Sequence, residues 1–236
     1  MIHFVDETGS TNADVADAVR AESEFSEGDW LVARRQTAGR GRQGREWFDG
    51  SGNFMGSTLV SLADQDPRPA SLSFVAALAV YDAVSMALSG TAKPQIKWPN
   101  DVLLNGAKLS GILLEMVKGH IVVGIGVNLA RAPSLPDRET AALADFIPVP
   151  ELEWFGQTLA ECFSDRADAW RQSGLGATLS EFQAASIHTP GAQVRVHDQD
   201  GSRVEGAFSG LDENDGALRL RLADGSERVI RAGDIL

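Results

Sequence analysis

A short segment near the N-terminus combines arginines with glycines. Between Trp30 and Arg45 there are five arginines and no acidic residue, in a chain of net charge −12. Glycine lets a backbone approach a ligand closely, and arginine binds carboxylate or phosphate through paired hydrogen bonds. We therefore predict an anion-binding loop, mobile when empty and ordered by its anion, with a plain basic turn as the alternative. The arginines are Arg34, Arg35, Arg40, Arg42 and Arg45.

The same loop matches the dinucleotide-binding pattern G-x-G-x-x-G at Gly39, Gly41 and Gly44. That pattern must follow a strand and open a helix within a βαβ unit. Here the chain runs on into Glu-Trp-Phe-Asp-Gly-Ser-Gly over residues 46–52, without a βαβ unit around it. We therefore reject a dinucleotide fold.

Two other segments place polar groups between apolar runs. Residues 97–101 read Lys-Trp-Pro-Asn-Asp, and Lys108 follows across an Asn-Gly turn. Taken alone, this stretch is as typical of a structural hairpin as of a site. Residues 124–128 read Gly-Ile-Gly-Val-Asn, where a flat ligand could approach and Asn128 could contact an adenine edge. Taken alone, such a stretch is more often a packed strand end.

Hydrophobic periodicity predicts the elements that must position these segments. Helices are predicted over 11–20, 71–88 and 151–172, and strands over 30–33, 54–62, 95–98, 110–117 and 121–125. Beyond Thr189 the pattern changes to short alternating strands separated by Gly/Asp turns, which is typical of a small β-barrel. We place the two domains at residues 1–187 and 188–236.

Composition is that of an ordinary globular protein, with 43% hydrophobic and 23% charged residues in 236. The charge of −12 argues against nucleic-acid binding, which needs a basic face. We find no secretory signal and no apolar run of the roughly 18 residues needed to span a membrane. The only cysteine, Cys162, has no partner for a disulfide or zinc site. We expect it to be buried, and we expect a cytoplasmic location.

Taken together, the segments resemble the biotin protein ligases, in the monofunctional form without a DNA-binding domain. The match covers nearly the whole chain, in the family's order and spacing. The matching pieces are residues 9–12, 36–47, 97–101, 108–111 with Glu115, and 124–128. The resemblance implies an α+β catalytic domain with a mixed sheet, like that of class II tRNA synthetases, and a C-terminal SH3-like barrel. Because the chain begins nine residues before Ser10, we do not expect a biotin-responsive repressor.

The resemblance also implies an activity in two steps. Biotin is activated with ATP as biotinyl-5'-AMP, releasing pyrophosphate, and is then transferred to a lysine of a biotin carboxyl carrier protein of acetyl-CoA carboxylase, releasing AMP. Mg²⁺ should accompany ATP and keep most of its waters, but no protein ligand is assigned to it. A homodimer stays open, because an exposed strand could pair with a second copy or with the carrier.

Residue roles follow from the same resemblance. Biotin's ureido ring has two donors and one acceptor, which need polar partners when buried. The residues implied for biotin are Ser10, Thr11, Asn12, Gln36, Gly39, Arg40, Gly41, Arg42, Lys108 and Gly111. Those implied for ATP and the adenylate are Arg42, Arg45, Trp47, Lys97, Asn100, Lys108 and Asn128. Trp47 would stack on the adenine, with a plain core position as the alternative.

Catalysis must bring two anions together, since the carboxylate of biotin attacks the α-phosphate of ATP. Cations at the developing charge lower that barrier, and the candidates are Arg42 and Lys108, followed by Lys97 and Arg45. In the second step the carrier lysine loses a proton, for which Asp101 could act as a general base or an orienting carboxylate.

Two other functions are weighed against this one. A lipoate–protein ligase shares the general fold and the adenylate chemistry, but it has less need of the ureido-binding set. A non-catalytic biotin sensor would not need Lys108 and Asp101, and both are present.

Overall fold

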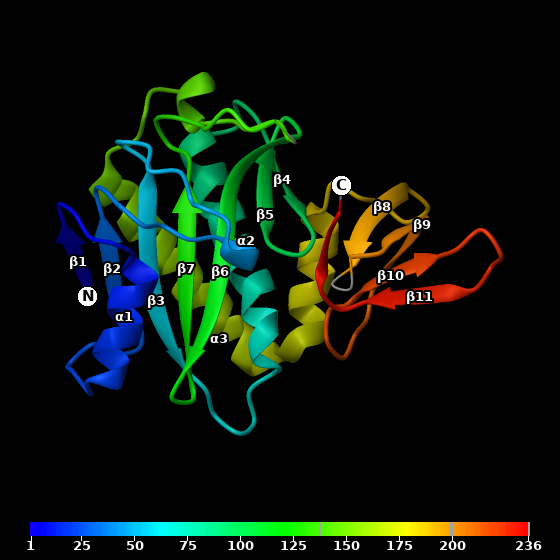
Figure 1. Cartoon of the computed structure of the whole chain (residues 1–236), viewed down its shortest axis with the longest axis horizontal. Coiled ribbons are helices and arrows are strands. Elements are labelled where there is room, and N and C mark those ends of the chain that lie inside the picture. Colours follow the sequence, from blue (N-terminus) through cyan, green and yellow to red (C-terminus); the bar gives the residue numbers. More distant parts are fainter. Residues whose placement is uncertain (137, 199–200, 236) are drawn as a thin grey trace.

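The computed structural model describes residues 1–136, 138–198 and 201–235. Within them the chain forms a seven-stranded sheet, in the order β1-β2-β3-β7-β6-β5-β4, and a five-stranded sheet, in the order β11-β10-β9-β8-β12. Figure 1 shows helix α1 on one face of the large sheet, α2 and α3 on the other, and the small sheet to one side. This agrees with the predicted α+β domain followed by a smaller β domain.

The large sheet is mixed, because β1 and β2 run parallel while the other neighbouring strands are antiparallel. The long strands β3, β7 and β6 form its centre, and their register places Gly111 opposite Gly126. Strands β1 and β5 were not predicted as separate elements. The strands are β1 (Ile2–Val5), β2 (Trp30–Ala33), β3 (Phe54–Ser61), β4 (Pro94–Lys97), β5 (Asp101–Leu104), β6 (Ala107–Val117) and β7 (His120–Val127).

Three helices cover the large sheet. Helix α1 (Thr11–Arg20) has the predicted bounds, and the side chain of Ser10 caps it. Helix α2 (Leu72–Leu88) begins one residue later than predicted. Helix α3 (Leu152–Ala185) continues well past the predicted end, through a kink where Gly174 has a φ of 75°. The prediction ended at residue 172, two residues before that glycine.

We expected no apolar run long enough to span a membrane, and by length and composition this was wrong. The segment Pro69–Leu88 is long and apolar enough to cross a membrane, judged by length and composition alone. Within the protein, 67% of the apolar window is buried. Helix α2 packs against α3 and against strands of the large sheet. Because neighbours cover it on most sides, most of its surface is apolar.

The small sheet follows α3 and packs beside the large domain. Its strands are β8 (Gln193–Asp198), β9 (Arg203–Leu211), β10 (Leu218–Arg221), β11 (Glu227–Ile230) and β12 (Gly233–Ile235). Trp98 donates from Nε1 to the carbonyl of Gly216 at 3.0 Å, which ties the two domains together. Strand β12, which was not predicted, pairs with β8 and carries Asp234 on the side of the large domain.

Candidate active site

Segments that lie far apart in the sequence meet around one cavity of about 670 Å³. Its wall comes from the start of α1, the arginine loop, strands β6 and β7, and Asp234 of the small sheet, together with Pro133, Leu135, Arg138 and Thr140. The predicted residues on the lining are Ser10, Thr11, Asn12, Gln36, Gly39, Arg40, Gly41, Arg42, Arg45, Trp47, Asn100, Asp101, Lys108, Gly111 and Asn128. The structure therefore brings together all of the residues predicted to bind biotin or ATP or to act in catalysis, except Lys97.

One end of the cavity, here called the amide end, is a hydrogen-bond network of Thr11, Asn12, Gln36, Ser57 and Glu115. The backbone N–H of Thr11 donates to Gln36 Oε1 at 2.7 Å. The hydroxyls of Thr11 and Ser57 lie 2.7 Å apart, and Ser57 donates to Asn12 Oδ1 at 2.6 Å. Asn12 Nδ2 in turn donates to Glu115 Oε2 at 2.7 Å. These polar side chains hold one another in place at the start of α1.

Ser57 was missed by the sequence analysis. It lies in β3 with none of its surface exposed, next to the buried Thr58. A short run of Gly56, Ser57 and Thr58 inside an otherwise apolar strand was the available signal. Nothing local in that run indicates that the hydroxyl of Ser57 faces the first turn of α1, 46 residues away along the chain.

Two glycines of β7 make room for the side chains at the middle of the cavity. Gly124 and Gly126 point to the same face of the strand, since side chains alternate along it. A Cβ at Gly124 would lie 2.1 Å from Asn12 Oδ1, and one at Gly126 would lie 2.2 Å from the ring of Trp47. The glycines that we expected to admit a flat ligand thus accommodate two of the protein's own side chains.

Trp47 lies across the sheet at this point. Its ring packs against Gly126 and also against Gly111, where an added Cβ would lie 3.0 Å from the ring. The Nε1 of Trp47 is buried and has no hydrogen-bond partner among the described residues. A Cβ at Gly111 would also lie 3.5 Å from Lys108 Nζ, so the indole and this ammonium are close neighbours. Trp47 therefore lies between the amide end and the charged groups.

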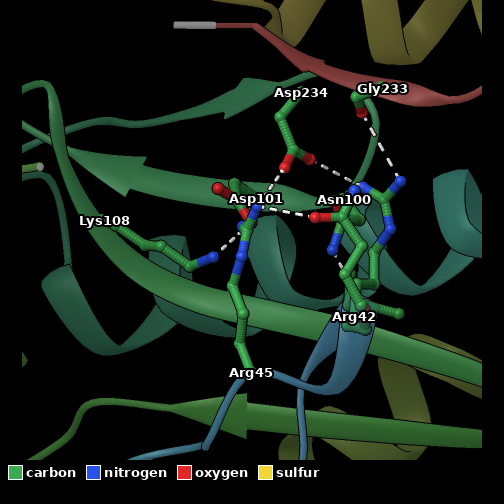
Figure 2. A network of polar contacts seen from close by, with 9 residues as sticks. Arg42, Arg45, Asn100, Asp101, Lys108, Gly233 and Asp234 are labelled. Atoms are coloured by element: carbon green, nitrogen blue, oxygen red, sulfur yellow. Dashed lines mark hydrogen bonds and ion pairs between the residues drawn. The ribbon is translucent and has the colours of Figure 1, made fainter. Parts of the chain in front are cut away.

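The other end of the cavity, here called the cationic end, is shown in Figure 2. Arg42 donates to Asn100 Oδ1 at 2.7 Å, to Asp234 Oδ1 at 3.1 Å and to the Gly233 carbonyl at 3.4 Å. Arg45 donates to the other oxygen of Asp234 at 2.8 Å. A single carboxylate of the small sheet thus bridges two arginines of the loop. We expected a loop that an anion must order, and the anion present is the chain's own Asp234.

Electrostatics favour this bridge. Burial alone would raise the pKa of Asp234, but the hydrogen bond from Arg45 and the charges of Arg42 and Arg45 outweigh it, so that the pKa lies below its ordinary value. Asp234 was not predicted as a site residue, and neither was the strand β12 that carries it. It reaches Arg42 from 192 residues further along the chain.

Lys108 and Asp101 face one another at the cationic end. They come from β6 and β5, which form the hairpin left open by the sequence analysis. Lys108 Nζ donates to Asp101 Oδ1 at 2.6 Å, and both side chains are 19% exposed. The backbone of Lys108 is held on its other side by Glu139 and Ala141. An ammonium and a carboxylate are thus presented together to the cavity.

Four predicted residues lie differently from what was expected. Arg34 pairs with Glu153, and Arg35 pairs with Glu7 at 2.6 Å, so these two arginines of the basic segment do not line the cavity. Asn128 lines it, but its amide donates to the Ala141 carbonyl at 3.1 Å and lies 3.5 Å from Asn53. That amide therefore holds neighbouring backbone, and adenine contact by Asn128 stays a prediction.

Lys97 is the fourth, and it lies outside the cavity lining. Strand alternation in β4 places it opposite Asp101 of β5, on the face away from the buried Ile96. Burial lowers the pKa of the Lys97 ammonium, and the charges of Arg138 and Lys108 act in the same direction, while Asp101 opposes them. The sequence placed Lys97 in the same motif as Asp101, but only Asp101 reaches the cavity.

A metal cage is absent from the part of the chain that the structure describes. No three or more His, Cys, Asp or Glu side chains gather there into a possible metal site. The carboxylates on the cationic end, Asp101 and Asp234, are each paired with a cation.

The sequence of the chain is similar to that of known biotin ligases. The biotin/lipoate A/B protein ligase family model matches residues 5–129, and the biotin protein ligase C terminal domain model matches residues 190–236. The chain is 50% identical to the biotin–[acetyl-CoA-carboxylase] ligase of Paracoccus denitrificans across 97% of both chains. It is 34% identical to the enzyme of the same name from Mycobacterium tuberculosis, across 100% of this chain and 88% of that one.

Solved structures show the same fold. The biotin protein ligase from Aquifex aeolicus in complex with biotin and ATP has a TM-score of 0.85 at 24% identity, covering 100% of this chain and 97% of that one. The ligase from Leishmania major in complex with biotinyl-5-AMP has a TM-score of 0.67 at 26% identity, covering 98% of both. With one family model over more than half of the chain and a relative half identical along nearly all of it, this chain belongs to the biotin/lipoate A/B protein ligase family, on the biotin protein ligase branch.

Proposed function

We propose that this chain is a biotin–[acetyl-CoA-carboxylase] ligase, which activates biotin with ATP and transfers it to a lysine of a carrier protein. The observation that carries the proposal is a single cavity with two different ends. The amide end offers uncharged donors and acceptors, and the cationic end offers Arg42, Arg45 and Lys108. Biotin has a polar ureido ring at one end and a carboxylate at the other, so one molecule can match both.

Binding follows from this polarity. The ureido ring contacts Thr11, Asn12 and Gln36, which are buried and already oriented by one another. The carboxylate then points toward Lys108 and Arg42. Trp47 lies between the two ends, beside Gly111 and Gly126, where its flat ring can stack on a ring of the ligand.

The first step joins two anions. An oxygen of the biotin carboxylate attacks the α-phosphorus of ATP, the bond to the bridging oxygen breaks, and pyrophosphate leaves with that electron pair. Arg42 and Lys108 offset the negative charge on the attacking and transferring oxygens. For ATP to enter, its phosphates must take over the hydrogen bonds that Asp234 now makes with Arg42 and Arg45.

The second step transfers biotin to the carrier. The lysine amine of the carrier attacks the carbonyl carbon of the mixed anhydride, the C–O bond to phosphate breaks, and AMP leaves. The attacking amine must lose a proton, and Asp101 lies at the cavity with its carboxylate beside Lys108. The loop carrying Arg42 covers this end and excludes water from the anhydride.

Mg²⁺ enters the proposal as the counter-ion of ATP. The described residues offer no cluster of three ligands, which suits an ion held mainly by phosphate oxygens and water, as is common for Mg²⁺. The ion would reduce repulsion between the carboxylate and the phosphates.

ATP–pyrophosphate exchange with purified protein tests the activation step. We expect exchange with biotin and not with lipoate, and we expect it to collapse in Lys108→Ala. Exchange that runs with lipoate instead would identify a lipoate ligase and overturn the assignment of the amide end. Binding of biotin without any exchange would identify a non-catalytic sensor.

The carrier is tested separately. Incubation of the enzyme, biotin and ATP with an acetyl-CoA carboxylase carrier domain should add one biotin, detected by mass spectrometry. The same domain with its acceptor lysine replaced by arginine is the control. Rapid exchange without transfer to the carrier domain would contradict the proposed acceptor.

A further inference from the structure

Two residues of the amide end have no part in the proposed mechanism. Ser57 and Glu115 do not line the cavity. Both nevertheless hydrogen-bond to side chains that do, with Ser57 beside Thr11 and Asn12, and Glu115 beside Asn12. Ser57 has no exposed surface, so its hydroxyl must find its partners within the protein.

The hydrogens of this network can be counted. A hydroxyl has a single hydrogen to donate, and an ionised carboxylate only accepts. Glu115 therefore takes the N–H of Asn12, which turns Asn12 Oδ1 toward Ser57. The hydrogen of Ser57 is used on that oxygen, at 2.6 Å.

The count then decides the direction of the Thr11 hydroxyl. Thr11 Oγ1 lies 2.7 Å from Ser57 Oγ and 3.1 Å from Gln36 Oε1. If its hydrogen pointed to Gln36, two hydroxyl oxygens would face one another at 2.7 Å without a hydrogen between them. Gln36 Oε1 already accepts the backbone N–H of Thr11. The Thr11 hydrogen therefore points to Ser57, and its lone pair is free to accept.

Gln36 is oriented in the opposite sense. Because its Oε1 faces Thr11, its NH₂ group lies on the other side, 3.1 Å from a Cβ position at Gly39. The cavity lining thus presents an acceptor at Thr11 and a donor at Gln36. These are the two kinds of partner that a cyclic urea needs.

We propose that Ser57 and Glu115 are positioning residues, which set the direction of the chain Thr11→Ser57→Asn12→Glu115 so that Thr11 Oγ1 accepts an N–H of the ligand. This inference rests on the proposed function, because it takes the ligand to be biotin. Ser57 and Glu115, which lie behind the cavity wall, would thus make the cavity select a ligand that carries an N–H donor. A ligand with no N–H at this end, such as lipoate, leaves the acceptor of Thr11 unpaired.

The test compares two buried hydroxyls on one strand. Ser57→Ala removes the link in the chain, and Thr58→Val removes the neighbouring hydroxyl, which donates to the Asp29 carbonyl at 2.7 Å on the other face. Ser57→Ala loses two buried hydrogen bonds and Thr58→Val loses one, so both should lower the melting temperature, Ser57→Ala by more. Only Ser57→Ala should raise the Kd of biotin by calorimetry and its KM, by about tenfold, with kcat and the KM of ATP unchanged.

A second variant approaches the network from its other end. Glu115→Gln replaces an acceptor by a group that can also donate, so Asn12 can turn over and the direction of the chain is lost. We expect a rise of several-fold in the Kd of biotin. No change in Glu115→Gln, or equal effects of Ser57→Ala and Thr58→Val on the KM of biotin, would overturn the inference.

Ligand analogues identify the group that Thr11 accepts. In each of two cyclic carbamates, one ureido N–H of biotin is replaced by oxygen. For one of them the ratio of affinities between wild type and Ser57→Ala should fall to about one, as in a double-mutant cycle. An unchanged ratio for both analogues would overturn the inference while the function stands. Wild-type protein that binds no biotin would overturn the function and, with it, the inference.

Discussion

At the amide end of the cavity, polar side chains of one domain satisfy one another, whereas at the cationic end two arginines are satisfied by a carboxylate from the other domain. Thr11, Gln36 and Asn12 are buried and hydrogen-bond to one another or to Ser57. Arg42 and Arg45 hold Asp234 in the place that the proposed function assigns to the phosphates of ATP. The amide end is hydrogen-bonded within its own domain, and under the proposed function the cationic end would exchange the carboxylate of Asp234 for phosphates.

The difference has a physical reason. An uncharged amide or hydroxyl can be buried at low cost once it is hydrogen-bonded, so the amide end can be rigid. A cluster of cations costs more to leave unpaired, because the charges repel and lose water on burial. The carboxylate of Asp234 offsets that cost in the empty protein. The predictions below test this contrast, beginning with the largest effect.

Loss of Arg42 should have the largest effect. Because Arg42 faces both the phosphate position and Asn100, Arg42→Ala should lower kcat/KM for exchange by about 10²–10³-fold, as for loss of a group that stabilises transition-state charge. Released biotinyl-AMP should increase relative to bound adenylate, measured by chromatography of the reaction. Arg34→Ala is the matched control, because Arg34 belongs to the same segment but pairs with Glu153. Equal losses in the two variants would contradict the assignment.

Substitutions of two strand glycines should affect the two ends of the cavity differently. Gly124→Ala pushes on Asn12, and Gly126→Ala pushes on Trp47. Overpacking of this kind costs about 1–3 kcal/mol, or roughly 5- to 150-fold in an affinity. We expect the first variant to raise mainly the KM of biotin and the second to raise the KM of ATP as well, in steady-state exchange assays. Identical profiles for both variants would show that the two ends do not act separately.

Removal of the bridging carboxylate should have a smaller effect, in the opposite direction. In Asp234→Asn the arginines lose a competing anion, so ATP should bind about threefold more tightly at low salt, as expected for a partly exposed ion pair. Docking of the small sheet should weaken at the same time, seen as a lower melting temperature. A rise in the KM of ATP would mean that Asp234 positions the arginines for ATP rather than competing with it.

Acid should remove the same bridge, with the smallest effect of the four. Although burial favours the neutral acid, the hydrogen bond from Arg45 and the nearby arginines hold the pKa of Asp234 below its ordinary value of 3.8. A depressed pKa contributes stability above the ordinary value and loses it as pH falls through the folded value. The difference in melting temperature between wild type and Asp234→Asn should therefore be constant from neutral pH to about pH 5 and shrink below pH 4. A difference that persists unchanged in strong acid would contradict this ion pair.

Much of the site was predictable because its residues lie in compact local motifs. The arginine loop, the segment 97–101 with Lys108, and the glycines of residues 124–128 each have a recognisable spacing, and nearly all of their predicted residues reach the cavity. Lys97 does not, because it lies on the edge strand β4, beyond its cross-strand partner Asp101. A motif predicts which segment is at the site, but the place of each strand in the sheet decides which of its side chains line the cavity.

The sequence by itself determined the local elements and the chemistry of the binding segments, because helical periodicity, capping and glycine–arginine spacing are properties of neighbouring residues. The tertiary structure alone decided the partners. Asp234 reaches Arg42 across 192 positions, and Ser57 reaches Thr11 across 46. A lone aspartate in a short terminal strand and a lone serine in a longer one have no local pattern that distinguishes them from others. Their roles arise from strand pairing and domain packing, which bring a carboxylate to two arginines and a buried hydroxyl to the first turn of a helix.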